Sequence, residues 1–241
     1  MAIGIPLAFS GPSFLSGMKS NLQRQPCGCT VFTDPEWGVL RSYQKCDHHK
    51  SMSGKSGLAY HEEMGAIKNG VVQHENYERE LLECVEIPEG PGRCLEIACG
   101  VGSYIPLLAD KLGYQYDGLE PDIPVADFVS EHFDALVYTE TYENLGVPRP
   151  EYDLIFCAHA FEHMEDSPGM MAKAFSQLKP GGRLVLIVPN DEDKCNPDHL
   201  WFWRSEDLHR VLSRIGFTDI KTVEKRRVPH EMFIYASAVK P

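Results

Sequence analysis

One segment, Arg93 to Asp122, constrains the fold more than any other part of the chain, because it has the pattern of a strand, a glycine turn, a helix and a second strand. Cys94, Leu95 and Ile97 give the first strand its apolar character, and Gly100 and Gly102 let the backbone approach a ligand closely. A second predicted strand, through Tyr114 and Tyr116, ends at Glu120, where an open α/β sheet places a carboxylate that accepts hydrogen bonds from a ribose. The segment therefore predicts a nucleoside site at the edge of a parallel sheet.

The helix inside this segment is expected to begin at a cap formed by Ser103 and to end at Gly113. Strand and helix patterns then alternate along the chain, as they do in α/β folds. The periodicity predicts further helices that begin near Asn76, Ser167 and Ser205, and strands over 152–157, 178–190, 218–228 and 231–239.

The glycine turn lacks the marks of two common phosphate-binding loops. Ile105 stands where a dinucleotide-binding fingerprint needs its third glycine, and no lysine precedes Lys111 to complete a P-loop. An acid-bearing turn of this kind suits a cofactor that has a ribose and a cationic amino-acid end but no phosphate. S-adenosylmethionine has those parts.

These residues resemble the class I S-adenosylmethionine-dependent methyltransferase family over roughly residues 61–241. Glu96 to Gly102 is similar to the acidic, glycine-rich loop of that family, with Ala98 in place of its first glycine, so that access to positive φ is expected to be lost there. The resemblance implies an α/β, Rossmann-like fold with a seven-stranded, mostly parallel sheet and an antiparallel last strand. It also implies methyl transfer to an oxygen or nitrogen, less readily a carbon, of an acceptor that is most simply a small molecule. By the same resemblance, the cofactor-binding residues are Glu96, Ala98, Gly100, Gly102, Glu120, Pro121, Asp122 and Ala158.

The segment His159 to His163 follows the fourth predicted strand of this fold, at the edge where such sheets bind ligands. Three roles stay open for it. A histidine, His163 before His159, would be a general base for a hydroxyl or amine. His159, Glu162 and His163 would bind a divalent metal, as some similar quinone-pathway O-methyltransferases do at this place. Otherwise Glu162 caps backbone amides and His163 packs against the cofactor loop.

The same segment also matches the inverzincin peptidase signature. That chemistry needs both histidines and the glutamate on one helix, whereas His159 directly follows an apolar strand. A peptidase is therefore disfavoured.

His199 and the aromatic run Trp201 to Trp203 lie between the fifth predicted strand and the last helix. In similar methyltransferases such residues overhang the acceptor pocket, which makes His199 a second candidate base. The alternative is a packed loop with a hydrogen-bonded histidine.

Residues 1–60 form a separate N-terminal segment that is rich in Gly, Ser, Pro, Cys and His and has no sustained periodicity. Cys27, Cys29, Cys46 and His49 supply three thiols and one imidazole, which suffice for a tetrahedral structural zinc site. The alternative is a loose arm with free thiols. The segment is also a candidate for docking a protein partner, gating the substrate or recognising the acceptor.

The composition of the chain restricts the classes of binding partner and the cellular compartment that we expect. A formal net charge of −12 disfavours binding to bulk nucleic acid, which depends on Lys and Arg neutralising phosphates. No apolar run approaches the roughly 18 residues of a membrane span, and the eight scattered cysteines indicate reduced thiols, so a cytoplasmic protein is expected. Two rival functions stay open: a noncatalytic nucleotide-binding protein with a zinc-stabilised arm, and an NAD-type oxidoreductase, which Ile105 disfavours.

Overall fold

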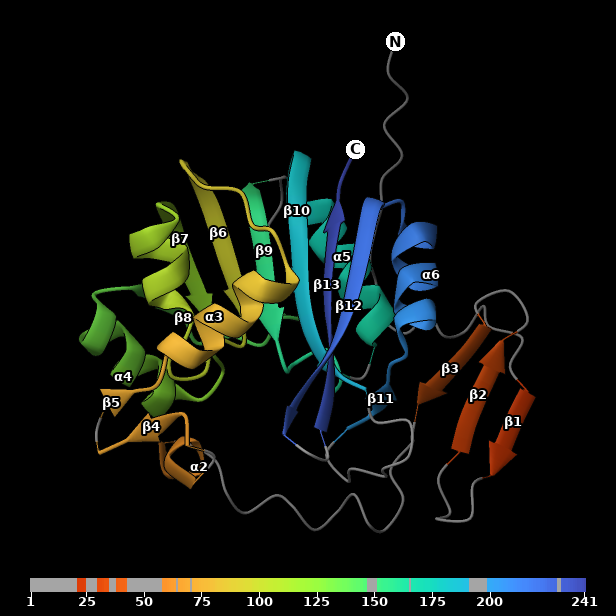
Figure 1. Ribbon diagram of the computed structural model, residues 1–241, viewed down its shortest axis with the longest axis horizontal. Helices are drawn as coiled ribbons and strands as arrows, with labels where there is room; N and C mark the ends of the chain where they lie inside the picture. Colours follow the sequence, from red (N-terminus) through yellow and green to blue (C-terminus); the bar gives the residue numbers. More distant parts are fainter. Residues whose placement is uncertain are drawn as a thin grey trace.

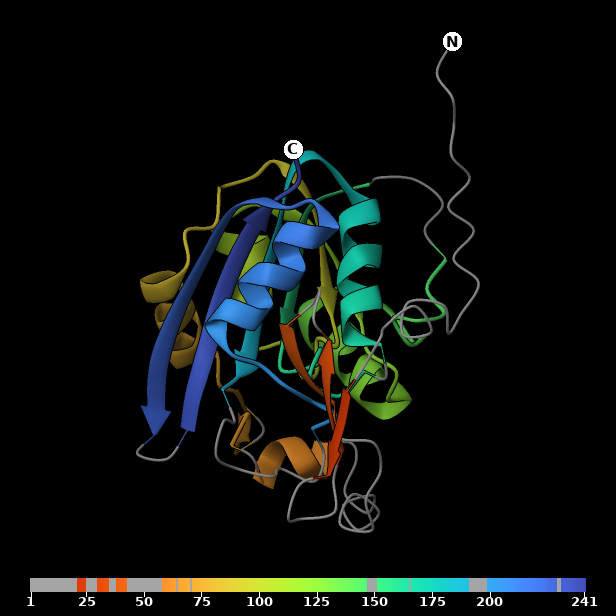
Figure 2. The same cartoon turned by 90° about the vertical axis from the view of Figure 1, so that its right-hand side faces the viewer.

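The computed structural model describes residues 21–24, 30–34, 38–42, 58–63, 65–69, 71–146, 151–164, 166–190, 199–228 and 231–241. Its main body is one sheet with helices on both faces (Figures 1 and 2). Seven strands form this sheet in the order β12-β13-β10-β9-β6-β7-β8. Their bounds are β6 Gly92–Ile97, β7 Tyr114–Leu119, β8 Leu136–Tyr138, β9 Tyr152–Ala158, β10 Leu178–Pro189, β12 Thr218–Val228 and β13 Glu231–Val239.

Strand β13 runs antiparallel to both of its neighbours, whereas β10, β9, β6, β7 and β8 pair in parallel. This architecture confirms the predicted mostly parallel, seven-stranded sheet with an antiparallel last strand. The expected strands 218–228 and 231–239 coincide with β12 and β13.

The helices surround this sheet and are short. None of those in the described part of the chain has the length and apolar character that a membrane crossing requires. Their bounds are α2 Leu58–Glu63, α3 Glu75–Cys84, the π-helix η2 Pro106–Lys111, α4 Ile123–Phe133, α5 Ser167–Gln177 and α6 Ser205–Ile215.

Side chains of the central strands alternate between two buried layers, because successive residues of a strand point to opposite faces. Leu95 and Leu186 belong to the layer that α5 and α6 cover. Cys94 and Val185, their neighbours in the chain, belong to the layer under α3, η2 and α4. Since both faces are covered, β9 and the second half of β10 consist mostly of apolar residues.

Several helix starts differ from the predicted ones. Ser103 lies in a turn, and η2 begins at Pro106, since proline suits the first helical position. Asp166, not Ser167, caps α5, and its carboxylate accepts a hydrogen bond of 2.9 Å from the backbone of Gly169. Helix α3 likewise begins just before Asn76, and Ser205 is the first residue of α6 rather than its cap.

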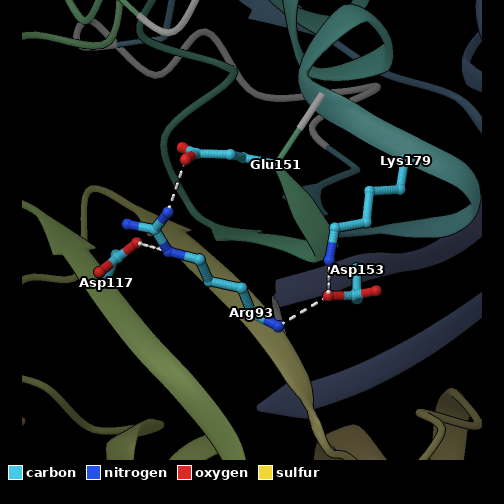
Figure 3. A network of polar contacts seen from close by, with 5 residues as sticks. All are labelled: Arg93, Asp117, Glu151, Asp153 and Lys179. Carbon is cyan, nitrogen blue, oxygen red and sulfur yellow. Dashed lines mark hydrogen bonds and ion pairs between the residues drawn. The ribbon is translucent and has the colours of Figure 1, made fainter. Parts of the chain in front are cut away.

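A polar network joins four neighbouring strands of the sheet (Figure 3). Arg93 Nε lies 2.8 Å from Asp117 Oδ2, and Arg93 Nη1 lies 2.9 Å from Glu151 Oε1. The backbone N–H of Arg93 donates to Asp153 Oδ2 over 2.8 Å, and Lys179 Nζ lies 2.7 Å from the same oxygen. These contacts link β6 to β7 and β9, and β9 to β10.

The described part of the N-terminal segment contains three strands that the sequence pattern did not predict: β1 Asn21–Arg24, β2 Thr30–Asp34 and β3 Gly38–Ser42. They pair antiparallel, and β3 also pairs with β11, Trp201–Phe202, to form a four-stranded sheet (Figure 1). A second small sheet consists of β4 Ile67–Lys68 and β5 Val71–Val72. The division of the chain at residue 60 stays a prediction. Cys27, Cys29, Cys46 and His49, the predicted zinc ligands, lie outside the described residues.

Candidate active site

The predicted cofactor residues meet at one edge of the sheet. Ile97, the last residue of β6, lies opposite Leu119 of β7 and Cys157 of β9. The turn after β6, the acid after β7 and the segment after β9 therefore share the carboxyl edge, where open α/β sheets bind ligands.

The turn after β6 depends on an uncommon backbone conformation. Ala98, Gly100 and Gly102 have φ angles of 54°, 52° and 79°. A Cβ on Gly102 would lie 2.8 Å from Ile105 Cδ1 and 2.8 Å from an atom of the Phe133 ring, so a side chain there would force its neighbours to move. The expectation that Ala98 loses positive φ is wrong, because this alanine adopts the left-handed conformation at a cost of about 1–2 kcal/mol.

Glu120 holds this turn with its carboxylate. Its Oε2 accepts a hydrogen bond from the backbone N–H of Gly100, and its Oε1 accepts one from Asp122, each over 3.0 Å. Burial raises the pKa of Glu120, while the two backbone donors oppose the shift. Asp122 in turn caps α4 by accepting a hydrogen bond of 3.3 Å from Val125, and Pro121 between the two acids is exposed.

Glu96 occupies the core beneath the turn. Its side chain is 2% exposed, and its Oε2 accepts a hydrogen bond of 2.6 Å from the hydroxyl of Tyr116. Burial raises the pKa of Glu96 to about 8, which the Tyr116 hydrogen bond opposes and the charge of Glu120 reinforces. The carboxyl is therefore a buried partner of Tyr116 that supports the turn from below.

His61, on α2, was missed by the sequence analysis. A Cβ added to Gly100 would lie 3.1 Å from Cε1 of His61, so the imidazole lies directly over the turn. Burial lowers the pKa of His61, and the charge of Asp122 opposes this shift. A short helix before the first strand of the large sheet gives no periodicity that points to a histidine in this position.

The segment after β9 makes a sharp turn at His159, whose φ is 57°. The backbone N–H of His159 donates to Ile187 of β10 over 2.8 Å, directly after Ala158. The imidazole packs edge-on against Phe233, with ring centroids 4.9 Å apart, and its Nδ1 lies 3.8 Å from Glu162 Oε1. Glu162 itself is 1% exposed.

The loop that carries His199 is fastened to this segment by hydrogen bonds. The carbonyl oxygen of Glu162 accepts from the backbone N–H groups of Leu200 and Trp201, over 2.7 Å and 3.1 Å. The indole N–H of Trp201 donates to the carbonyl of Met164 over 2.7 Å. The loop thereby brings the ring of His199 to 4.9 Å from the ring of His163, centroid to centroid.

The aromatic run next to His199 is packed in the protein. Trp201, Phe202 and Trp203 are 2%, 4% and 1% exposed, and the two indoles stack at 5.7 Å. This arrangement favours the packed-loop alternative for these three rings. The ring of His199, by contrast, lies edge-on against the ring of His163.

A group of potential metal ligands forms at this place among the described residues. One ligand atom each from Glu162, His163 and His199 lie within 4.8 Å of one another. The group shares two residues with the set expected from the sequence, and His199 replaces His159.

Comparison with known proteins shows that the chain is similar to methyltransferases. A family model described as a methyltransferase domain matches residues 72–222. The chain is 23% identical over 156 residues to phosphoethanolamine N-methyltransferase 3 of Arabidopsis thaliana, covering 59% of this chain and 32% of the relative. It is 30% identical over 105 residues to ubiquinone biosynthesis O-methyltransferase of Rhodopseudomonas palustris (strain BisB18), covering 41% of this chain and 40% of that protein. The matched region thus spans about a third of the plant relative's length.

The solved structures show the same fold. Phosphoethanolamine N-methyltransferase 2 of Haemonchus contortus, in complex with phosphomonomethylethanolamine and S-adenosylhomocysteine, superposes with a TM-score of 0.65 at 13% identity. The superposition covers 80% of this chain and 58% of that one.

Proposed function

The chain belongs to the class I S-adenosylmethionine-dependent methyltransferase family, and we propose that it transfers a methyl group from S-adenosylmethionine to an oxygen or nitrogen of a small molecule. The observation that carries the proposal is the placement of Glu120. Its nearly buried carboxylate ends the second strand of the nucleoside-binding unit and lies against the glycine turn. The names of the relatives, which act on phosphoethanolamine or in ubiquinone biosynthesis, support a small acceptor.

The residues at the sheet edge fit this cofactor, which supplies a methyl group on a sulfonium that leaves as a neutral thioether. Gly100 and Gly102 present backbone rather than side chains. Glu120 carries acceptor oxygens for the ribose hydroxyls, and its partly desolvated setting strengthens such hydrogen bonds. Glu96 supports the turn through Tyr116. Ala98, Pro121, Asp122 and Ala158 complete the edge.

The histidines act on the acceptor side in this proposal. Holding donor and acceptor in line supplies most of the acceleration, so that orientation is the first task of His159, His163 and His199. A base is needed where the acceptor must lose a proton, and an imidazole has a suitable pKa range for that step. His163 is the first candidate, because its side chain is 43% exposed beside the buried Glu162.

We infer further that Cys27, Cys29, Cys46 and His49 bind a structural zinc ion, because three thiolates and one imidazole are a common closed ligand set. Such a site would order the N-terminal segment for contact with a protein partner or the acceptor. The free thiols of Cys84, Cys94, Cys99 and Cys157 support a reducing compartment such as the cytoplasm. Zinc content measured on the purified chain should fall by one equivalent in the double variant Cys27→Ser/Cys29→Ser.

Isothermal titration with S-adenosylhomocysteine tests the cofactor assignment. Glu120→Ala should weaken binding on the order of 10- to 100-fold, because hydrogen bonds to a charged group are lost. Glu131→Ala, which removes an exposed carboxylate from α4, should bind like the parent. Unchanged affinity in Glu120→Ala, or tight binding of NAD by the parent, would overturn the proposal.

A further inference from the structure

A small unit of the chain lies over the turn after β6. It consists of α2 and the hairpin of β4 and β5, and it lies at the carboxyl ends of the parallel strands (Figures 1 and 2). The backbone N–H of Ala66 donates to the carbonyl oxygen of His61 over 2.9 Å, and that of Gln73 donates to Ala66 over 2.8 Å. Hydrogen bonds between consecutive segments thus join α2 to the hairpin.

Apolar side chains hold this unit against the nucleoside-binding part of the chain. Ile67 and Val72 of the hairpin are buried together with Val101 of the turn and Val125 of α4, and Phe128 packs against the same cluster. Residues from before and after the turn therefore share one small core. This core places α2 beside both the turn and the start of α4.

The position of His61 follows from this packing. A Cβ added to Gly100 would lie 3.1 Å from Cε1, 3.7 Å from Nε2 and 3.9 Å from Nδ1 of the imidazole. Asp122 lies near enough for its charge to oppose the lowering of the His61 pKa that burial causes. The imidazole is thus close to the glycine turn and to the residue that caps α4.

Glu120 lies on a different side of the same glycine. The backbone N–H of Gly100 points to Oε2 of Glu120, whereas the direction in which a side chain would leave Gly100 points to His61. A nucleoside held through its ribose at Glu120 would reach His61 with the substituent on its 5′ carbon, where that substituent runs along the turn. In S-adenosylmethionine this substituent ends in an amino acid with a carboxylate.

We propose that His61 is a further cofactor-binding residue, whose imidazole N–H donates a hydrogen bond to the carboxylate at the amino-acid end of S-adenosylmethionine. The inference deepens the proposed function and rests on it for the identity of the cofactor. It assigns recognition of the amino-acid end to a residue outside the glycine turn, and it makes α2 part of the binding site.

The charges around the turn favour a donor in this position. Glu120 and Asp122 offer only acceptor oxygens when they are ionised, and like charges repel, so neither attracts a carboxylate. Burial lowers the pKa of His61, so that the free ring is neutral near pH 7 and carries one N–H donor. A hydrogen bond from this donor to a carboxylate has a charged acceptor and is therefore stronger than a bond between two neutral groups.

Calorimetric titration of the full chain with two ligands tests the contact. S-adenosylhomocysteine has the amino-acid end, whereas 5′-methylthioadenosine has the same nucleoside and sulfur without it. His61→Ala should weaken binding of S-adenosylhomocysteine roughly tenfold or more, because a hydrogen bond to a charged group is lost. Binding of 5′-methylthioadenosine should stay near the parent value.

Two further variants separate recognition from a structural effect. His61→Gln keeps an N–H donor and should recover part of the affinity for S-adenosylhomocysteine. His209→Ala, which removes an exposed imidazole from α6, should bind both ligands as the parent does. A purely structural role of His61 would weaken both ligands alike, because both depend on the same turn and on Glu120.

The outcomes distinguish this inference from the proposed function. If the parent binds both ligands and Glu120→Ala loses both, the cofactor assignment stands. Equal losses for the two ligands in His61→Ala, or unchanged affinity for S-adenosylhomocysteine, then overturn the contact at His61 alone. If the parent binds neither ligand, the proposed function fails and the inference about His61 fails with it.

Discussion

The backbone N–H of Gly100 donates a hydrogen bond to Oε2 of Glu120 over 3.0 Å, across the edge of the sheet from one strand end to the next. The other carboxylate oxygen accepts from Asp122, the cap of α4. One acid thus fixes both the turn that would face the amino-acid end of the cofactor and the start of the helix beside it. Because the same carboxylate is proposed to hold the ribose, the shape of the turn and nucleoside binding are coupled.

Gly100→Ala should disturb this coupling. The added methyl group would lie 3.1 Å from His61 Cε1, and alanine would have to keep a φ of 52°. We expect a loss of about 1–2 kcal/mol in the free energy of unfolding and weaker binding of S-adenosylhomocysteine. Urea denaturation and calorimetry measure the two effects.

Two further variants separate the causes of that loss. In Gly146→Ala the new methyl group meets no atom within 4 Å, so stability and binding should stay near the parent values. Combining Gly100→Ala with His61→Ala removes the steric contact and leaves the backbone strain. If Gly100→Ala binds S-adenosylhomocysteine as the parent does, the turn does not contact the cofactor as proposed.

A substitution at Ala98, two residues before Gly100, is expected to change the free energy of unfolding in the opposite direction. Ala98 has a φ of 54°, so Ala98→Gly should relieve strain and raise the free energy of unfolding by up to about 1 kcal/mol, after the greater flexibility of glycine in the unfolded chain is subtracted. The same substitution in a regular helix, Ala126→Gly in α4, should lower it by at least about 1 kcal/mol, because it also removes a buried methyl group. Thermal unfolding of both variants measures the contrast, and destabilisation of the two alike would contradict the strain at Ala98.

Local patterns were sufficient for most of the large sheet. The buried runs of β9 and β10 and the bounds of β12 and β13 follow from apolar periodicity and turn residues, because strands covered on both faces carry a strong signal. Helix starts were predicted less accurately. Asp166, rather than Ser167, caps α5, and Pro106 sets the start of η2.

The parts of the site that depend on tertiary contacts could not be predicted from the sequence. His61 reaches Gly100 from a short helix, and His199 reaches His163 through hydrogen bonds to the Glu162 carbonyl. Neither contact follows a fixed sequence spacing. The burial of Trp201 in the core likewise depends on the packing around it, which composition alone does not give.

Glu96 predicts a pH dependence of stability. Burial raises its pKa from 4.5 to about 8 in the folded protein, so over that interval the folded state holds a proton that the unfolded state has lost. The stabilisation from protonated Glu96 is complete below the unfolded pKa and is lost as the pH rises through the folded pKa. Stability should therefore decline between about pH 5 and pH 8 by on the order of 1 kcal/mol per pH unit from this group.

Glu96→Gln should flatten that decline, because glutamine stays neutral and its oxygen can still accept from Tyr116. Urea denaturation of parent and variant across the interval measures the two slopes. Glu131→Gln, at an exposed site of α4, should retain the parental slope. Equal slopes for Glu96→Gln and the parent would show that Glu96 is ionised in the folded protein.

Replacement of Arg93 is expected to lower the free energy of unfolding through ion pairs that lie away from the active site. Asp117 is 1% exposed and forms an ion pair with Arg93 Nε, whereas Glu151, the other partner of the guanidinium, is 47% exposed (Figure 3). Arg93→Met would leave a buried carboxylate without this cation and should lower the free energy of unfolding by about 3–5 kcal/mol. Glu151→Ala should cost about 0–1 kcal/mol, because its pair is exposed to solvent.

Asp117→Asn in the Arg93→Met background should recover part of the loss, since it removes the buried charge. A double-mutant cycle by urea denaturation measures the coupling, and a cost for Arg93→Met no greater than that for Glu151→Ala would show that Asp117 does not depend on this ion pair.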